Sequence, residues 1–352
     1  MRTPVIASIG TALPPMKMTQ AESLAYILAN FGGRDGTKAL YKRVMSNPSV
    51  QTRHFAMDNP DEAMEMSLDA RNKRFQVRGA ALSCEALGQA LVSAGLKPDG
   101  LDFLVTTTCT GYLCPGFSSY IVEGAGLRPG TAVFDIAGMG CGAAVPALRL
   151  ASDFVRANPG TNAAVVSTEL CSTTMVTDDD PQLIISNSIF ADGSAAAIVT
   201  DRQVPGPRIM DFSFQTEPAS RESLRFRSDR GYLRNVLAKE VPALTAGALG
   251  KALAGLSKSA PLPMDRLRWI LHPGGATVLD AIRDGIGISE ERLASSRSIL
   301  RRCGNMSSPT VLFVLKEEME ISPPAPGTPA ILAAYGAGFA AYAALLEFGD
   351  GS

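Results

Sequence analysis

The chain has 352 residues, of which 46% are hydrophobic and 19% are charged, and its formal net charge is −1. A chain of this length exceeds one small core, so we expect two subdomains or one large layered domain. A near-zero net charge excludes the basic footprint that nucleic-acid binding needs. Since no basic segment precedes an apolar run at the N-terminus, we expect no signal peptide and a reduced, cytoplasmic setting.

Strand-like apolar runs alternate with Ala- and Leu-rich helical patterns. In chain order they predict a helix over 79–95, buried strands over 101–109 and 131–137, a helix over 142–157, buried strands over 162–168 and 195–201, and helices over 242–256 and 275–285. Further strands are predicted over 269–275, 310–316 and 330–336. This alternation indicates a layered α/β chain. The Pro- and Gly-containing region 201–207 is the best place to divide it, into 1–204 and 205–352.

Residues 321–346 carry no charge and resemble a membrane span at first sight. A spanning helix needs about 20 strongly apolar residues. Here prolines crowd the first part, and the rest is mostly Ala and Gly. We therefore expect a loop, a buried strand, a turn and further buried structure, and no membrane span.

Cysteine and histidine usage argues against a metal site. The cysteines are Cys84, Cys109, Cys114, Cys141, Cys171 and Cys303, and the histidines are His54 and His272. Cys109 and Cys114 are not a CxxC pair, and the cysteines lack metal-ligand spacing. We expect free thiols and no bound metal.

Cys141 lies where a strand-like run breaks into Gly138-Met139-Gly140 and then becomes a helical pattern. This places the sulfur on a tight turn at a helix N-terminus, where unpaired N–H groups and the helix dipole favour a thiolate. The pattern predicts a nucleophile. The alternative is a buried structural cysteine, which is common for this residue type.

Two later segments carry further candidate site residues. His272 lies in WILHPGG, at the end of an apolar strand beside a Gly turn. Asn305 lies in CGNMSSPTVLFVL, a polar turn that leads into an apolar run, and on its own it reads equally as a turn residue. Neither residue alone settles a function.

Together these segments resemble the thiolase superfamily and, within it, the type III polyketide synthases (chalcone-synthase-like enzymes), over nearly the whole chain. The resemblance implies a duplicated α-β-α-β-α fold and a catalytic triad of Cys141, His272 and Asn305. The more specific motifs are HPGG, which holds Gly274 and Gly275, and GNMSS, which holds Ser307. The segment SIFADGSAAAIV places the family's gatekeeper aromatic at Phe190, and AAYGAGFAAYAALL resembles its Gly-rich closing segment.

The resemblance also implies a chemistry. The Cys141 thiolate takes an acyl group from an acyl-CoA, and decarboxylation of malonyl-CoA supplies a carbon nucleophile. His272 and Asn305 are expected to stabilise the enolate oxygen, and His272 to lower the pKa of Cys141 by ion pairing. CoA thioesters are the substrates, and no cofactor is signalled.

For CoA binding, the segment ALYKRVMSNPSVQTRHF resembles the family's CoA-binding helix, and Arg43 matches one of its basic positions. Leu40 and Asn47 stand at two others, a departure for which Lys42 or Arg53 could compensate. Gly274 and Gly275 are also expected to contact CoA. The alternative for this helix is a solvated charged face.

The resemblance implies a substrate pocket that includes Cys109, Cys171, Thr174 and Ser307. Cys114 falls where the family inserts a residue into the partner's pocket, which implies a homodimer. Asn235 stands at the position of a second gatekeeper Phe, so the entrance is expected to be more open. Residues 225–230 depart from the family's pattern, so the resemblance implies nothing about the cavity floor.

These features favour condensation of an acyl-CoA starter, fatty rather than aromatic, with malonyl-CoA to an alkylpyrone, resorcinol or related phenolic. Alternatives are aromatic starters, as in chalcone synthases, or the initiating ketoacyl-acyl-carrier-protein synthase. A 3-hydroxy-3-methylglutaryl-CoA synthase would need a Glu general acid, and Glu123, Glu169 and Glu217 lie in no such motif. A non-catalytic partner of this fold is disfavoured because Cys, His and Asn are all present.

Overall fold

A computed structural model describes residues 3–256, 262–321 and 323–351. The helices are α1 (Gln20–Asn30), α2 (Asp35–Met45), α3 (Leu68–Arg74), α4 (Ala80–Ser93), α5 (Phe117–Gly124), α6 (Ala144–Ala157), α7 (Pro181–Ile189), α8 (Val241–Leu256), α9 (Ala276–Ile286), α10 (Ala294–Cys303) and α11 (Thr310–Ile321). The strands are β1 (Val5–Ala12), β2 (Met16–Thr19), β3 (Thr52–Phe55), β4 (Phe103–Thr108), β5 (Ala132–Ala137), β6 (Asn162–Leu170), β7 (Asp192–Thr200), β8 (Pro205–Thr216), β9 (Leu224–Asp229), β10 (Tyr232–Leu237), β11 (Arg268–Leu271), β12 (Pro329–Gly336) and β13 (Ala340–Asp350).

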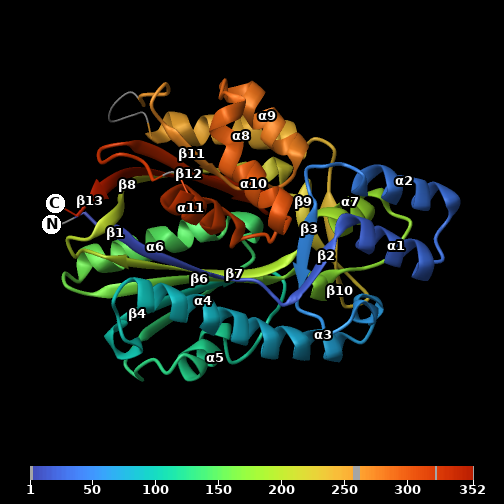
Figure 1. Cartoon of the computed structure of the whole chain (residues 1–352), viewed down its shortest axis with the longest axis horizontal. Coiled ribbons are helices and arrows are strands. Elements are labelled where there is room, and N and C mark those ends of the chain that lie inside the picture. The colour runs from blue at the N-terminus through green and yellow to red at the C-terminus, as the bar shows by residue number, and fades with distance from the viewer. Residues whose placement is uncertain (1–2, 257–261, 322, 352) are drawn as a thin grey trace.

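Within these residues one nine-stranded sheet has the order β11-β12-β13-β8-β1-β7-β6-β4-β5. Helices α8 and α9 cover one outer face, α4 and α5 cover the other, and α6 and α11 lie between the two parts of the folded sheet (Figure 1). Three hydrophobic cores fill the spaces between these layers. The arrangement confirms the predicted layered α-β-α-β-α architecture.

The two parts of the sheet meet where β1 pairs with β8, at Val5 opposite Arg208. Strands β8, β11, β12 and β13 lie on one side of this junction, and β1, β4, β5, β6 and β7 lie on the other. Strand β8 begins at Pro205. The division of the chain into 1–204 and 205–352 remains a prediction.

Most predicted elements are present with small shifts at their ends. Helices α4, α6, α8 and α9 match the four predicted helices, and β4, β6, β7 and β12 match predicted buried strands. The expected strand over 310–316 is wrong, because this segment opens helix α11. Residues 310–315 are all buried in the middle layer. An apolar run buried on every side fits a core helix as well as a strand, so periodicity could not separate them.

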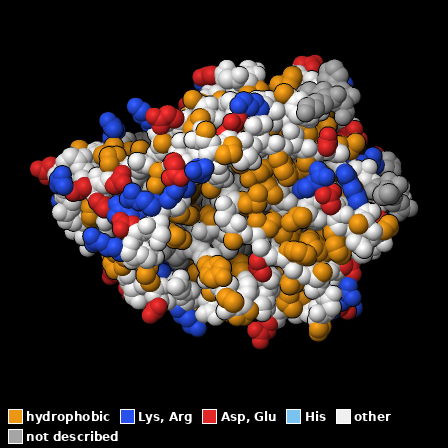
Figure 2. All heavy atoms as spheres, turned by 180° about the vertical axis from the view of Figure 1, so that it is seen from behind, with side chains coloured by type: hydrophobic (Ala, Val, Ile, Leu, Met, Phe, Trp, Pro, Cys, Tyr) orange, Lys and Arg blue, Asp and Glu red, His pale blue; other side chains and the backbone are white. Residues whose placement is uncertain are grey.

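Strand β5 forms as predicted but is not buried. It lies at the edge of the sheet, and the exposed fractions of Val133 and Phe134 are 42% and 56%. Other large apolar side chains are exposed as well, among them Tyr112, Leu150, Met210 and Phe214. Figure 2 shows hydrophobic side chains gathered over the centre of one face of the molecule. None of the described helices has the length and apolarity that a membrane crossing requires.

Arg53 is buried at the C-terminal end of α7. Its Nη1 donates to the carbonyl oxygens of Asn187 (2.7 Å) and Phe190 (2.9 Å), and its Nε donates to Gln20 Oε1 at 3.0 Å. The side chain is 1% exposed. A guanidinium in this position pairs carbonyls that the end of a helix leaves open. The sequence suggested that Arg53 could compensate at a CoA site. Its burial excludes that role, and Arg53 instead holds the segment that carries Phe190.

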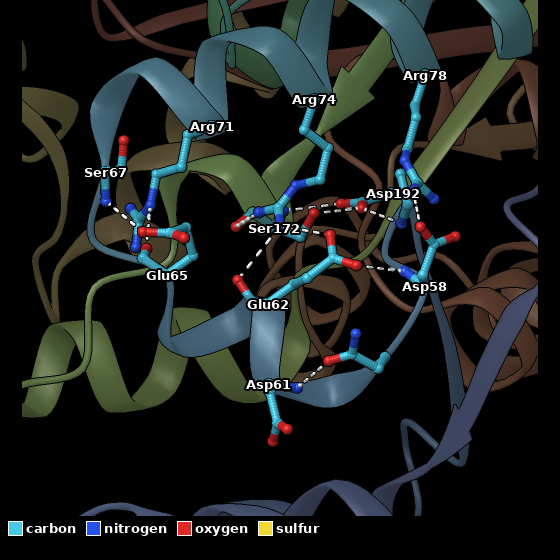
Figure 3. Close-up of polar contacts among 12 residues, drawn as sticks. Asp58, Asp61, Glu62, Glu65, Ser67, Arg71, Arg74, Arg78, Ser172 and Asp192 are labelled. Carbon is cyan, nitrogen blue, oxygen red and sulfur yellow. Dashed lines mark hydrogen bonds and ion pairs between the residues drawn. The ribbon is translucent and has the colours of Figure 1, made fainter.

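Two further arginines hold the neighbouring segment from α3 (Figure 3). Arg74 Nη2 donates to the Ser172 carbonyl at 3.2 Å, and Arg71 Nη1 donates to the Thr173 carbonyl at 3.3 Å. On the other side, the Asp192 carboxylate accepts the Ser172 N–H and hydroxyl at 2.8 and 2.6 Å. Buried charges thus fix the 3-10 turn at residues 171–174 as well as the end of α7.

Replacing the buried guanidinium should destabilise the fold strongly. In Arg53→Met the carbonyls of Asn187 and Phe190 lose their partner and Asp192 loses a nearby cation, so we expect the free energy of unfolding to fall by about 3–5 kcal/mol. The measurement is denaturant-induced unfolding.

The matched control is Arg202→Met, which removes a half-buried arginine that holds one carbonyl, of Ala94, at 3.1 Å. Its loss should be about 1 kcal/mol. Equal losses of unfolding free energy in the two variants would show that the buried Arg53 contributes no more than a half-buried arginine with one carbonyl partner.

Candidate active site

Cys141 lies on the 3-10 turn Gly140–Gly142, between β5 and α6, as the sequence predicted. Gly140 has φ 60°, a conformation that favours glycine. The loop after β12 presses against this turn: a Cβ on Gly336 would lie 2.4 Å from the Met139 carbonyl and 3.2 Å from the Cys141 nitrogen. The Gly-rich closing segment therefore needs glycine to approach the nucleophile.

Ser307 contacts the sulfur directly. Its Oγ donates to Cys141 Sγ at 3.2 Å, and its N–H donates to Asn305 Oδ1 at 2.8 Å. The φ of Ser307 is 61°, which is uncommon for a residue with a side chain. Thr310 Oγ1 stabilises this conformation by donating to the Ser307 carbonyl at 2.8 Å. Strained residues of this kind cluster at functional sites.

Backbone contacts connect the other two predicted triad residues. The Gly274 N–H donates to the His272 carbonyl at 3.1 Å, and Asn305 Nδ2 donates to the Gly274 carbonyl at 3.0 Å. The structure thus gathers the HPGG turn, the GNMSS turn and the Cys141 turn in one place. Both ring nitrogens of His272 are buried and have no hydrogen-bond partner among the described residues.

Burial controls the protonation of the nucleophile and of the histidine. It raises the pKa of the Cys141 thiol to about 12 and lowers the pKa of His272 to about 3. Burial therefore opposes the expected thiolate and its ion pair with His272 in the empty site. The reaction then requires that a proton leave the sulfur.

A cavity of about 620 Å³ opens beside Cys141. The pocket residues predicted from sequence that line it are Cys109, Cys171, Thr174, Phe190, Asn235 and Ser307. His272 and Asn305 are not on its wall; Asn305 is joined to it through its hydrogen bond with Ser307. Cys114 is exposed and does not line the cavity of its own chain.

The predicted CoA residues lie outside this cavity. Arg43 is exposed in the last turn of α2. Gly275 precedes the first residue of α9, and Gly274 packs against Tyr335. A separate groove is lined by Asn47, Ala276 and Arg301 among others, so it lies between the end of α2 and the beginning of α9.

Sequence reasoning missed an aromatic residue of the cavity. Phe226 on β9 is the cross-strand partner of Asn235 on β10, and both line the cavity. The aromatic that is absent at 235 is thus matched by one on the neighbouring strand. The signal was present as alternation in LRFRSD, but only the pairing of the two strands shows that Phe226 and Asn235 are neighbours.

Glu169 was also missed as a site residue. Its carboxylate accepts from Ser308 Oγ at 2.8 Å, from the Cys109 N–H at 2.9 Å and from Thr110 Oγ1 at 2.8 Å. Cys109 Sγ lies 3.3 Å from it. Burial raises the pKa of this carboxyl. A Glu at the end of an otherwise apolar strand was the available signal, since such a residue is almost never buried without partners.

Comparisons with known proteins agree with this geometry. Residues 32–208 match the family described as FAE1/Type III polyketide synthase-like protein, and residues 217–339 match the chalcone and stilbene synthase C-terminal domain. The chain is 31% identical to a 1,3,6,8-tetrahydroxynaphthalene synthase of Streptomyces peucetius subsp. caesius, over 97% of this chain and 93% of the relative. It is 29% identical to a 3,5-dihydroxyphenylacetyl-CoA synthase of Amycolatopsis balhimycina, over 97% and 92%.

Solved structures show the same relationship. The crystal structure of PKS-I from the brown alga Ectocarpus siliculosus superposes with a TM-score of 0.90 at 27% identity and covers 99% of both chains. The 1,3,6,8-tetrahydroxynaphthalene synthase of Streptomyces coelicolor A3(2) gives 0.91 at 25% identity, over 98% and 99%. The chain therefore belongs to the type III polyketide synthases, thiolase-fold enzymes of the chalcone-synthase type that build polyketides from acyl-CoA and malonyl-CoA.

Proposed function

We propose that this enzyme loads a short acyl-CoA starter on Cys141, extends it with malonyl-CoA and cyclises the chain to a phenolic product. The observation that carries the proposal is the Cys141 thiol at the wall of a cavity which Phe226 and Phe190 narrow. The names of the relatives, a tetrahydroxynaphthalene synthase and a dihydroxyphenylacetyl-CoA synthase, also favour phenolic rings. A fatty starter and an alkylpyrone or resorcinol form the second candidate, which Asn235, smaller than an aromatic residue, favours at the cavity wall.

In the loading step, His272 takes the proton of the Cys141 thiol as sulfur attacks the thioester carbon. The bond between that carbon and the CoA sulfur breaks, and the CoA thiolate leaves with the proton from His272. Both residues are neutral before the step, so no charge has to be held in the empty, buried site.

In the extension step, malonyl-CoA loses CO₂ and leaves an enolate. The Asn305 side-chain amide donates to the enolate oxygen, together with His272. Asn305 Nδ2 is held beside the HPGG turn through the Gly274 carbonyl, and Oδ1 is held by the Ser307 N–H. The enolate carbon attacks the acyl carbon on Cys141, and the bond between that carbon and the Cys141 sulfur breaks. The sulfur leaves as a thiolate that carries the negative charge of the enolate, and the chain, now two carbons longer, is a CoA thioester.

CoA itself is proposed to lie along the groove between α2 and α9. Arg43, Gly274 and Gly275 flank this region, and Arg301 adds a basic side chain near Asn47, where the family pattern lacks one. Phosphate groups at the first turn of α9 would face its N–H groups. The coenzyme's phosphates then pair with Arg43 and Arg301.

The first test is product formation from malonyl-CoA and starters that range from acetyl-CoA through long fatty acyl-CoAs to 4-coumaroyl-CoA, followed by mass spectrometry. We expect phenolic products from short starters, and none from Cys141→Ala. The control Cys84→Ala removes a half-buried thiol on α4 and should keep full activity. Activity only with acyl-carrier-protein donors would contradict the proposal, and products only from long starters would favour the second candidate.

Phe226 should limit the length of the starter. In Phe226→Ala the cavity gains the volume of the ring, so kcat/KM for starters several carbons longer should rise about tenfold, which corresponds to one or two extra buried methylenes. Kinetics with a series of acyl-CoA lengths measure this. The neighbouring control, Arg227→Ala, changes an exposed side chain on the same strand and should leave the series unchanged. An unchanged length preference in Phe226→Ala would show that the limit lies elsewhere.

We also propose that the enzyme is a homodimer. The edge strand β5 exposes Val133 and Phe134, and Tyr112 and Cys114, in the loop after β4, are exposed too. Exposed apolar clusters of this kind mark interaction surfaces. A second copy of the chain is the proposed occupant, with Cys114 reaching the partner's cavity.

Phe134→Asp should therefore produce a monomer, because a carboxylate would be buried without a partner in the interface. Sedimentation velocity should give about twice the chain mass of 37.0 kDa for the unmodified protein and a single chain mass for the variant. Val92→Asp changes an exposed apolar residue on α4 and should leave the dimer intact. A monomeric unmodified protein would refute the dimer.

A further inference from the structure

Both ring nitrogens of His272 are buried without a hydrogen-bond partner among the described residues, and the hydroxyl oxygen (Oη) of the neighbouring Tyr335 contacts the Gly274 backbone. The two side chains are 1% and 5% exposed. A buried polar atom without a partner costs about 1–3 kcal/mol. Such atoms are rare in folded proteins, and each one calls for an explanation. An unpartnered imidazole next to a hydroxyl that can still accept a hydrogen bond indicates a contact that forms only during the reaction.

Tyr335 lies between the turns of the base and of the nucleophile. Its ring packs against the His272 ring with centroids 5.2 Å apart and an interplanar angle of 66°. A Cβ on Gly274 would lie 1.9 Å from Tyr335 Oη, so the hydroxyl reaches the HPGG backbone. The next residue, Gly336, packs on the Cys141 turn. Strand β12 therefore places the Tyr335 hydroxyl beside the HPGG turn.

The other surroundings of His272 offer little to an imidazolium. A narrow gap with no room for a water molecule borders His272 and Tyr335 and is otherwise lined by apolar side chains, including Leu249, Leu271 and Ile282. The Glu169 carboxylate, which interacts with Cys141, already accepts from several donors. Tyr335 Oη is the polar atom next to the ring, and its contact with the Gly274 backbone leaves it able to accept a further hydrogen bond.

The loading step creates a need for such an atom. When the Cys141 proton reaches one nitrogen of His272, both ring nitrogens carry N–H groups and the ring is charged. One N–H faces the sulfur, and the second requires an acceptor. In Ser-His-Asp and related sites a third group orients the base and accepts this N–H. A tyrosine oxygen can accept a hydrogen bond in the same way.

We propose that Tyr335 is a positioning residue that accepts the second N–H of His272 while Cys141 is deprotonated. This proposal rests on the proposed roles of Cys141 and His272. The hydroxyl stabilises the thiolate–imidazolium state and acts through His272, without contact with the substrate. Its place outside the cavity wall agrees with this indirect role.

The variant Tyr335→Phe keeps the ring packing and removes one oxygen atom. We expect the rate of Cys141 alkylation by iodoacetamide at pH 7 to fall about tenfold, because a hydrogen bond to a charged group is lost. The midpoint of the alkylation rate against pH should move to higher pH, since the thiolate loses support. KM for the starter should stay unchanged while kcat falls. The free energy of unfolding should change little, because the removed hydroxyl has a single contact, with the Gly274 backbone, in the empty site.

The matched control is Tyr120→Phe, which removes a hydroxyl that accepts from Gln76 Nε2 at 3.1 Å on α5. It should leave the alkylation rate unchanged. In the His272→Gln background, Tyr335→Phe should have no further effect on alkylation, because Tyr335 acts through His272. An additive effect in that background would overturn the proposed route.

The failure of this inference differs from a failure of the proposed function. If the unmodified protein forms no acyl-Cys141 with any acyl-CoA, the proposed function fails, while the alkylation profile still tests Tyr335. If Tyr335→Phe and the unmodified protein show the same alkylation rates at every pH, the inference is wrong even when polyketide synthesis is confirmed.

Discussion

The active site depends on the close approach of the loop after β12 to the turn that carries Cys141. A side chain at Gly336 would overlap the Met139 carbonyl and the Gly142 nitrogen, at 2.4 and 2.7 Å. This contact joins two segments that lie far apart in the sequence, because Cys141 follows β5 and Gly336 ends β12. It also brings β12 beside the HPGG turn, so His272 and Asn305 reach the nucleophile only while the loop is packed. A side chain at 336 would therefore push the end of β12 away from the Cys141 turn.

Burial makes this site reactive, and it also lowers the stability of the protein while the site is empty. The apolar surroundings that hold Cys141 and His272 neutral exclude water, and they strengthen every electrostatic interaction that forms later. Both ring nitrogens of His272 remain without hydrogen-bond partners among the described residues in the empty site. Proteins tolerate such violations mainly at functional sites, where stability is exchanged for activity. The buried arginines compensate nearby, since Arg53 and Arg74 fix the cavity wall with hydrogen bonds to backbone carbonyls.

Much of this arrangement could be predicted from sequence, because local patterns encode it. The glycine turn before α6 placed Cys141, and family motifs placed Phe190 and Ser307 on the cavity. Properties that depend on three-dimensional neighbours could not be read in this way. The apolar run at 310–316 fits a core helix as well as a strand, and the exposure of β5 follows from its place at the sheet edge. From the sequence, Arg53 is a candidate for CoA binding, and only the three-dimensional structure places it in the buried end of α7.

The pairing of Phe226 with Asn235 shows that substrate choice also depends on three-dimensional neighbours. Aligning single positions suggests that the loss of an aromatic at 235 opens the cavity. The cross-strand partner of that position is an aromatic that lines the same wall, so the loss is offset by a residue 9 positions earlier in the chain. Side chains that face each other across a ladder share one volume. The size of the cavity is therefore a property of the β9–β10 pair, and a change at either strand has meaning only together with its partner.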